Sequence, residues 1–119
     1  MKNNKHVCDF SYLSETMGEK KHLVKEIIDV FLKQVPEELQ SINNAITKAD
    51  YSIIKNSAHT MKSSVSIMGI SELAPVLQEM EALGATASNI EKIKALNQKL
   101  DFTCKQAIKE IEREKQNYT

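Results

Sequence analysis

The 119-residue sequence is poor in aromatic residues, in turn formers and in net charge. It has no tryptophan, and aromatic side chains make up 5% of it. Proteins that bind single-stranded nucleic acid usually stack bases on aromatic side chains, and nucleic-acid binders usually carry a basic excess. Here sixteen basic residues balance sixteen acidic ones, so nucleic-acid binding is not favoured. Three glycines and two prolines fit long helices with short loops better than many short strands.

Long apolar runs and paired cysteines are also missing. No stretch of ~18 apolar residues occurs, so we expect no membrane contact by this segment. Residues 1–5 are not followed by an apolar segment, and no signal peptide is expected. Cys8 and Cys104 form no CxxC pair and are expected to be free thiols in a cytoplasmic chain. Length and a 41% apolar content predict one domain over residues 1–119, with flexible ends at 1–8 and 114–119.

Apolar residues recur at helical spacing along most of the chain. A short helix is predicted over residues 9–17, ended by Gly18, and a longer one over residues 19–35. Pro36 should kink that helix or begin a new one, because proline cannot donate a helical hydrogen bond. The apolar face of residues 19–35 is wider than one core-facing stripe needs, so part of it could serve a partner.

Start and stop signals divide the rest of the chain. Asp50 is the expected N-cap of a helix from Tyr51 to about Met68, and Gly69 ends it. Ser71 should cap a fourth helix that ends at Gly84, and residues 88–91 (SNIE) have the form of a capping box for the last. The last helix has a near-heptad apolar stripe of Ile93, Leu96, Leu100, Cys104, Ala107 and Ile111. We therefore predict an all-α fold: an antiparallel up-down-up-down four-helix bundle with an extra short N-terminal helical segment.

One histidine lies on the polar side of the third predicted helix. At about 100° per residue, His59 falls roughly 140° from the centre of the apolar stripe. Lys62 and Ser63 follow it by three and four positions, and Lys55 and Ser66 lie one turn before and two turns after it. Residues at such spacings are neighbours on a helix surface, so these side chains surround the imidazole.

Several roles for this imidazole can be weighed. It could be a surface histidine without a role. A zinc site is weakly indicated, since His6 and His22 lie in other segments and no Cys/His ligand spacing occurs. A hydrolase triad is also weak, because no G-x-S-x-G turn is present. Nucleophilic chemistry by the imidazole itself remains, because its ordinary pKa of about 6.5 leaves it mostly neutral in cells.

The residues around His59 carry a resemblance. Ala58-His59-Thr60-Met61-Lys62-Ser63-Ser64, followed by Gly69, resembles the A-H-x-L-K-G-S-x4-G signature of histidine-containing phosphotransfer (HPt) domains of bacterial phosphorelays. Three further segments look like that family: the break at residues 31–37, the turn at 49–50 and the run 77–84. Ser63 stands where the family most often has glycine, and Met61 where it has leucine. Serine is the next smallest polar residue, and methionine conserves volume.

The resemblance implies a phosphorelay intermediate. His59 would take a phosphoryl group from a receiver-domain phospho-aspartate and pass it to another receiver. Lys62 would offset the phosphoryl charge, and Ser63 would either donate a hydrogen bond or simply stay small. Glu81 could accept a hydrogen bond from His59 Nδ1–H, with Gln78 as the alternative partner, or be an ordinary surface carboxylate.

The implied partners are response-regulator receiver domains and a hybrid sensor histidine kinase, with this chain a monomer. Each receiver would bring its own Mg²⁺, so no cofactor or metal is expected here. Docking candidates are Ile28, Phe31 and Leu32, for each of which core packing is as good a hypothesis, together with Lys55 and Ser66. Two alternatives stay open. One is a non-catalytic helical adaptor, and the other is an enzyme, disfavoured because no nucleotide-binding loop or paired acid and base occurs.

Overall fold

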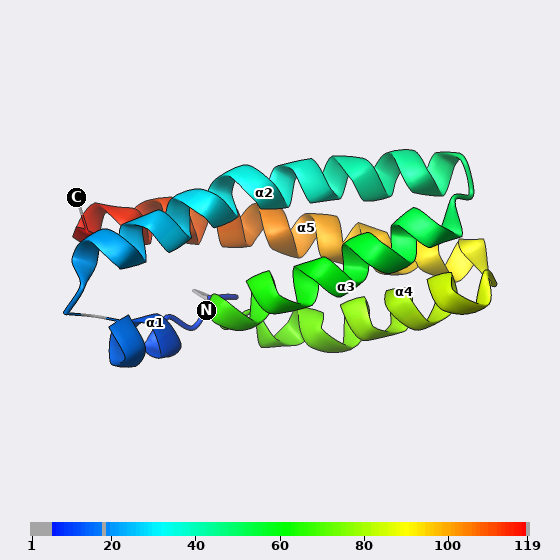
Figure 1. The fold of residues 1–119 in the computed structure, drawn as a ribbon. Helices are drawn as coiled ribbons and strands as arrows, with labels where there is room; N and C mark the ends of the chain where they lie inside the picture. The colour runs from blue at the N-terminus through cyan, green and yellow to red at the C-terminus, as the bar shows by residue number, and fades with distance from the viewer. Residues whose placement is uncertain (1–5, 18, 119) are drawn as a thin grey trace, which may run out of the picture.

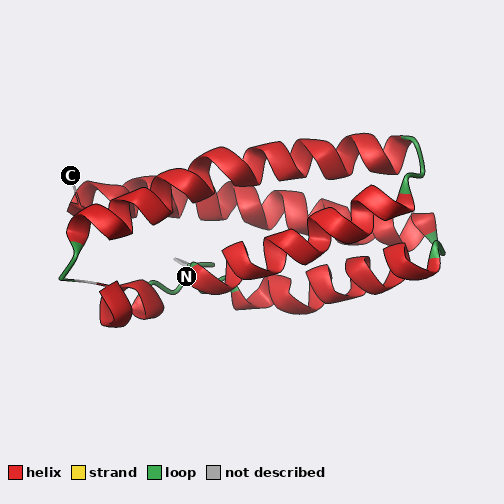
Figure 2. Ribbon diagram, viewed as in Figure 1, coloured by secondary structure: helices red, strands yellow, loops and turns green. Residues whose placement is uncertain are grey.

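A computed structural model describes residues 6–17 and 19–118, and within them every regular element is helical (Figures 1 and 2). The short helix α1 covers Ser11–Met17, and the four long helices are α2 (Lys21–Thr47), α3 (Tyr51–Ile67), α4 (Ala74–Thr86) and α5 (Ile90–Lys115). Short 3-10 turns at Ser71–Leu73 and Gln116–Tyr118 complete the list of elements. The all-α prediction is confirmed, including the short N-terminal helix. The expected stop at Gly18 lies outside the described residues.

The four long helices enclose one core. Contacts run from α2 to α3, from α3 to α4, from α4 to α5 and from α5 back to α2, as Figure 1 shows. The apolar faces meet inside, and the largest fully buried side chains come from all four helices and from α1, among them Leu13, Ile28, Ile42, Ile54, Met61, Leu77, Met80, Ile93 and Leu100. Cys104 is 0% exposed, so its predicted place in the core is confirmed.

Helix α2 runs through Pro36 without a break, so the prediction that a new helix begins there is wrong. Proline inside a helix costs about 3 kcal/mol. Phe31 and Val35 before it and Leu39 and Ile42 after it are all buried on the same face. Full burial of such side chains contributes about 1.5–3 kcal/mol each, which outweighs the cost. Pro36 itself is exposed, so water can reach the carbonyl that loses its hydrogen bond.

Both ends of α3 follow the predicted signals. The Asp50 side chain accepts a hydrogen bond from the Ile53 N–H at 3.2 Å, which satisfies one of the unpaired donors of the first turn. At the other end Gly69 adopts φ +65, and the Ile70 N–H reaches back to the Val65 carbonyl at 2.9 Å. Glycine takes this left-handed conformation at little cost, so it ends the helix that carries His59.

The junction between α4 and α5 differs from the prediction. Helix α4 continues through Gly84 to Thr86, and Ala87 takes the left-handed cap conformation instead. The cap of α5 is Asn89, whose side chain accepts from the Lys92 N–H at 3.2 Å, and the Ser88 hydroxyl pairs with Thr86. Likewise Ser71 begins a 3-10 turn, and α4 starts after it. At these two junctions the local signals located the turns to within a few residues, but they did not identify the residue that caps the helix.

Described residues at both chain ends make specific contacts. The backbone N–H groups of Val7 and Cys8 bind the buried carboxylate of Glu110, and Tyr118 packs against the core. The expected flexible ends at 1–8 and 114–119 thus include residues held against the bundle. In the described part of the chain, no helix is both long and apolar enough to cross a membrane.

Candidate functional site

His59 projects from the outer face of α3. Its side chain is 67% exposed, whereas Ala58 and Met61 on the inner face are almost fully buried. The helical count predicted this orientation, because inner and outer positions alternate with the 3.6-residue period. The core holds α3 rigidly while the imidazole stays accessible to another molecule.

Glu81 of α4 fixes the orientation of that imidazole. One of its carboxylate oxygens, Oε2, lies 2.7 Å from His59 Nδ1, while the glutamate side chain itself is only 19% exposed. An ionised carboxylate can only accept, so Nδ1 carries the proton. In the neutral imidazole the other ring nitrogen, Nε2, then has the free lone pair, on a side chain that is mostly exposed.

Lys62 completes a three-residue network with the same carboxylate. Its Nζ lies 2.6 Å from Glu81 Oε1 and donates to Gln78 Oε1 at 3.2 Å. Hydrogen bonds first from Lys62 and then from His59 hold the pKa of Glu81 below its ordinary value, against the opposing effect of burial. Glu81 therefore stays ionised at neutral pH, and Lys62 is held within one helical turn of the imidazole. Gln78, the alternative partner for His59, binds Lys62 instead.

Close approach of α3 and α4 makes this network possible. Gly84 lies one turn beyond Glu81 and faces the backbone of Lys55, which lies one turn before His59. A Cβ placed on Gly84 would come within 2.9 Å of Lys55 N, so no larger residue fits without movement. Glycine thus permits the helix separation that lets a glutamate reach His59.

Ser63 lies one turn after His59 on the exposed surface, where the family signature most often has glycine. Lys55 and Ser66 are exposed as well, one turn before and two turns after His59 along α3. The two serines have short side chains and add little steric obstruction to an approaching partner, whereas Lys55 adds a charge.

Two of the expected docking residues belong to the core. Ile28 is 0% exposed and Phe31 4%, so the expectation that Ile28 offers a docking surface is wrong, and Phe31 exposes very little of its surface. The apolar face of α2 is wide because α3 and α5 both pack against it. Leu32 is half-buried and packs against the same core.

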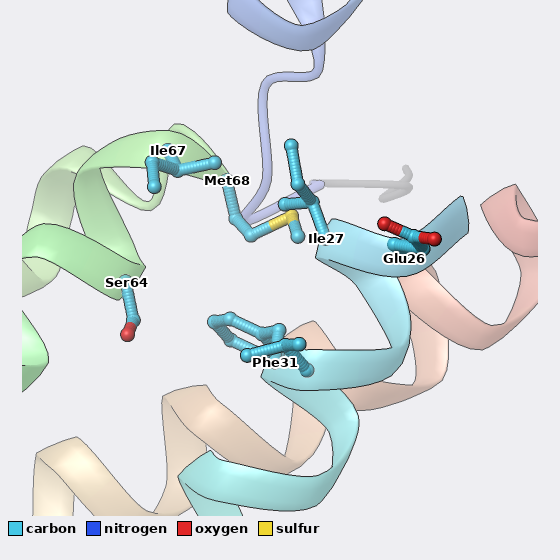
Figure 3. Close-up of a pocket in the computed structure, with 7 residues that line it drawn as sticks. Glu26, Ile27, Phe31, Ser64, Ile67 and Met68 are labelled. Carbon is cyan, nitrogen blue, oxygen red and sulfur yellow. The ribbon is translucent and has the colours of Figure 1, made fainter. Parts of the chain in front are cut away.

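An apolar groove does open between α2 and the end of α3 (Figure 3). We call it the α2–α3 groove. Its volume is about 290 Å³, and its lining residues are Glu26, Ile27, Val30, Phe31, Ser64, Ile67 and Met68. In Figure 3, Phe31 of α2 and Met68 at the end of α3 both point toward it. Ile27, Val30 and Ile67 are not among the docking residues predicted from sequence, although the exposed apolar residue Val30 follows Ile27 by three residues, a helical spacing.

Comparison with known proteins gives this geometry a family. The sequence model of the Hpt domain matches residues 26–114, and the chain belongs to the Hpt domain family. Membership assigns it a histidine phosphotransfer role in a phosphorelay, a class of protein that is not a classical enzyme. Hpt domains generally interact with receiver domains and kinases.

A solved structure has the same fold. Histidine-containing phosphotransfer protein B (HptB) from Pseudomonas aeruginosa PAO1 superposes with a TM-score of 0.86 at 21% sequence identity. The match covers 98% of this chain and 100% of that one. No curated protein matches the sequence.

Proposed function

We propose that His59 receives a phosphoryl group from the phospho-aspartate of one receiver domain and passes it to the aspartate of another. The observation that carries this proposal is the exposed imidazole whose Nδ1 is held by Glu81. Nε2 attacks the phosphorus, a P–N bond forms, and the bond from phosphorus to the aspartate oxygen breaks. The proton on Nδ1 stays in its hydrogen bond with Glu81. Transfer to the second receiver reverses these bond changes.

Lys62 assists phosphoryl transfer by its positive charge, and Ser63 assists it by its small size. Phosphoryl transfer depends chiefly on positioning and on stabilising the phosphoryl oxygens. Lys62 Nζ already lies beside the histidine through their shared carboxylate, so its cation is available when the phosphoryl group arrives. Ser63 leaves room for the partner and has a hydroxyl that can donate. The Mg²⁺ for the aspartate chemistry belongs to the receiver.

The partner docks on the face that contains His59. The α2–α3 groove lies on the side of α3 that faces α2, next to the face of His59, and offers apolar contact through Ile27, Val30 and Ile67. Exposed Lys55 and Ser66 add polar contacts, with half-buried Leu32 at the margin. Transient signalling complexes commonly bury a small area, which this face can supply. The intended partners are response-regulator receivers, including that of a hybrid sensor kinase.

The bundle order and the extent of the domain belong to the same proposal. The closed ring of contacts among α2, α3, α4 and α5 supports an up-down-up-down bundle. Short connections between successive helices support it too. The contacts that join residues 7 and 8 to Glu110 support a single domain that includes both described chain ends.

The test is transfer of label from a phosphorylated receiver. Wild-type protein should gain acid-labile, base-stable label, and His59→Gln should gain none. His22→Gln is the matched control, because His22 is an exposed histidine on α2 outside the network. If His59→Gln still gained label, the assignment of His59 as the phosphorylated residue would be wrong. Binding of receivers without any labelling of the wild type would favour the adaptor alternative.

A further inference from the structure

Glu110 is a buried carboxylate that the proposed phosphotransfer does not use. It points inward from α5 and is only 6% exposed. A buried ionised group is costly unless it is hydrogen-bonded. The groups that bind this carboxylate therefore indicate its structural role.

Those partners lie at the other end of the chain. The Val7 N–H donates to Glu110 Oε2 at 2.9 Å and the Cys8 N–H to Oε1 at 3.0 Å, across more than a hundred residues of sequence. Gln106, one turn earlier on α5, adds a third bond at 3.3 Å. Burial raises the pKa of Glu110, but the bonds from Val7, Cys8 and Gln106, with the nearby His6, together outweigh this effect and keep the net pKa below its ordinary value.

A second anchor holds the same segment against α3. The Asp9 N–H donates to the Met68 carbonyl at 3.1 Å, at the C-cap of the helix that carries His59. Gly69 lies so close that a Cβ there would come within 2.1 Å of Asp9 O. Figure 1 shows the N-terminal segment passing beside this end of α3. Residues 7–9 thus connect α5 to the end of α3, two helices that are not successive in the ring of contacts.

We propose that Glu110 is a latch that fastens residues 7–9 across the bundle, and that this segment can open as a unit while α2 to α5 stay folded. Leu13 is the one fully buried residue of α1, and Val7, Cys8 and Phe10 are only partly buried, whereas the four long helices supply most of the core. Segments with few buried contacts open locally at lower free energy than the whole protein. Opening also removes the hydrogen bond to the carbonyl of Met68, a residue that lines the α2–α3 groove.

Amide exchange and thiol labelling test the latch in the full-length protein. In Glu110→Gln the side-chain amide must point a donor at one of the two backbone N–H groups, and the negative charge is lost. We expect exchange at Val7 and Cys8 to accelerate by roughly tenfold or more. The Cys8 thiol, which lies 3.9 Å from the Ala107 carbonyl, should react faster with a disulfide reagent to a similar degree. Protection in α2 to α5 should stay unchanged.

Glu112→Gln is the matched control, because Glu112 is exposed on the same helix and should leave both rates unchanged. Val7→Pro tests the latch from the other side, since it removes a bonded N–H without altering α5, and it should also release Cys8. Unchanged exchange at residues 7 and 8 in Glu110→Gln would overturn the proposal. Equal loss of protection throughout the four long helices would overturn it too, because Glu110 would then stabilise the whole fold.

Discussion

The two ring nitrogens of His59 have different surroundings, and the proposed chemistry depends on that difference. Nδ1 lies against Glu81, while the His59 side chain is two-thirds exposed on the outer face of α3. Removing the carboxylate should therefore change which nitrogen carries the proton, and with it the nucleophile. A carboxylate hydrogen bond to a group of this kind contributes about 1.5–3 kcal/mol.

Glu81→Ala should slow phosphoryl transfer by roughly tenfold or more and leave the helix content unchanged. Glu81→Gln keeps an oxygen that can accept from Nδ1–H, so it should retain more of the rate. Single-turnover transfer from a phosphorylated receiver measures both. Equal rates in wild type and Glu81→Ala would show that the carboxylate has no part in transfer.

Lys62 should control the acidity of Glu81. Because the folded pKa of Glu81 is lowered, chiefly by Lys62, its stabilising effect is present above the ordinary glutamate value and is lost as pH falls through the depressed value. In Lys62→Ala the Glu81 titration, followed by carboxyl NMR, should move to higher pH, and transfer should be slower. An unmoved titration would contradict the observed ion pair, and an unchanged transfer rate would make Lys62 a bystander.

Residue-scale prediction from sequence succeeded where a motif and a helical period agreed. The exposed placement of His59 follows from the period, and the neighbourhood of Lys62 follows from its spacing. That Glu81 rather than Gln78 meets the imidazole could not be derived from periodicity. The two differ by less than a turn of α4, and the packing of α4 on α3 decides between them. The burial of Ile28 depends on which helices cover α2, which its own pattern does not contain.

At the scale of elements, the separation of α3 and α4 positions the site. Gly84→Ala gains up to about 1 kcal/mol of helix propensity, but its Cβ meets the Lys55 backbone. We expect a net loss of stability of about 1–2 kcal/mol in urea unfolding, together with slower transfer because Glu81 moves from His59.

Ala85→Leu is the control for that substitution. It adds more volume at the exposed neighbouring position, and it should change stability by less than about 0.5 kcal/mol. A Gly84→Ala protein as stable and as active as wild type would show that helix separation does not position the site.

Pro36 allows a second test at this scale. Pro36→Ala restores a backbone donor at an exposed position within the continuous helix α2 and should stabilise the protein by about 1–3 kcal/mol. Glu37→Ala next to it should be nearly neutral. No gain in urea stability would mean that α2 already compensates fully for the missing bond. Local rules predicted either a kink or a new helix here, and burial on both sides of the proline keeps one continuous helix instead.

At the scale of the whole molecule, the two cysteines differ in burial: Cys104 lies inside the core and Cys8 is only partly buried. Burial, with a smaller effect from Asp101, raises the pKa of Cys104 to about 12, so this thiol stays protonated at pH 8. Its reaction with a disulfide reagent should therefore follow global unfolding, rising steeply with urea, whereas Cys8 should react first through local opening. Rapid labelling of Cys104 without denaturant would contradict the packed core.

The all-α architecture was predictable because composition, period and caps agree along the chain. Contacts between distant segments were not predictable from the sequence, as Glu110 illustrates. From sequence it is one more charged residue on an amphipathic helix, and only the folded chain brings the amides of residues 7 and 8 to it. The same holds for the α2–α3 groove, whose walls come from two helices.

Locating the phosphoryl group tests most directly whether His59 Nε2 is the nucleophile. After transfer from a receiver, long-range ¹H–¹⁵N NMR of the phosphorylated protein distinguishes the two ring nitrogens of each histidine. We expect phosphate on Nε2 of His59, with Nδ1 still protonated toward Glu81. Phosphate on Nδ1 of His59, or on any other residue, would contradict it.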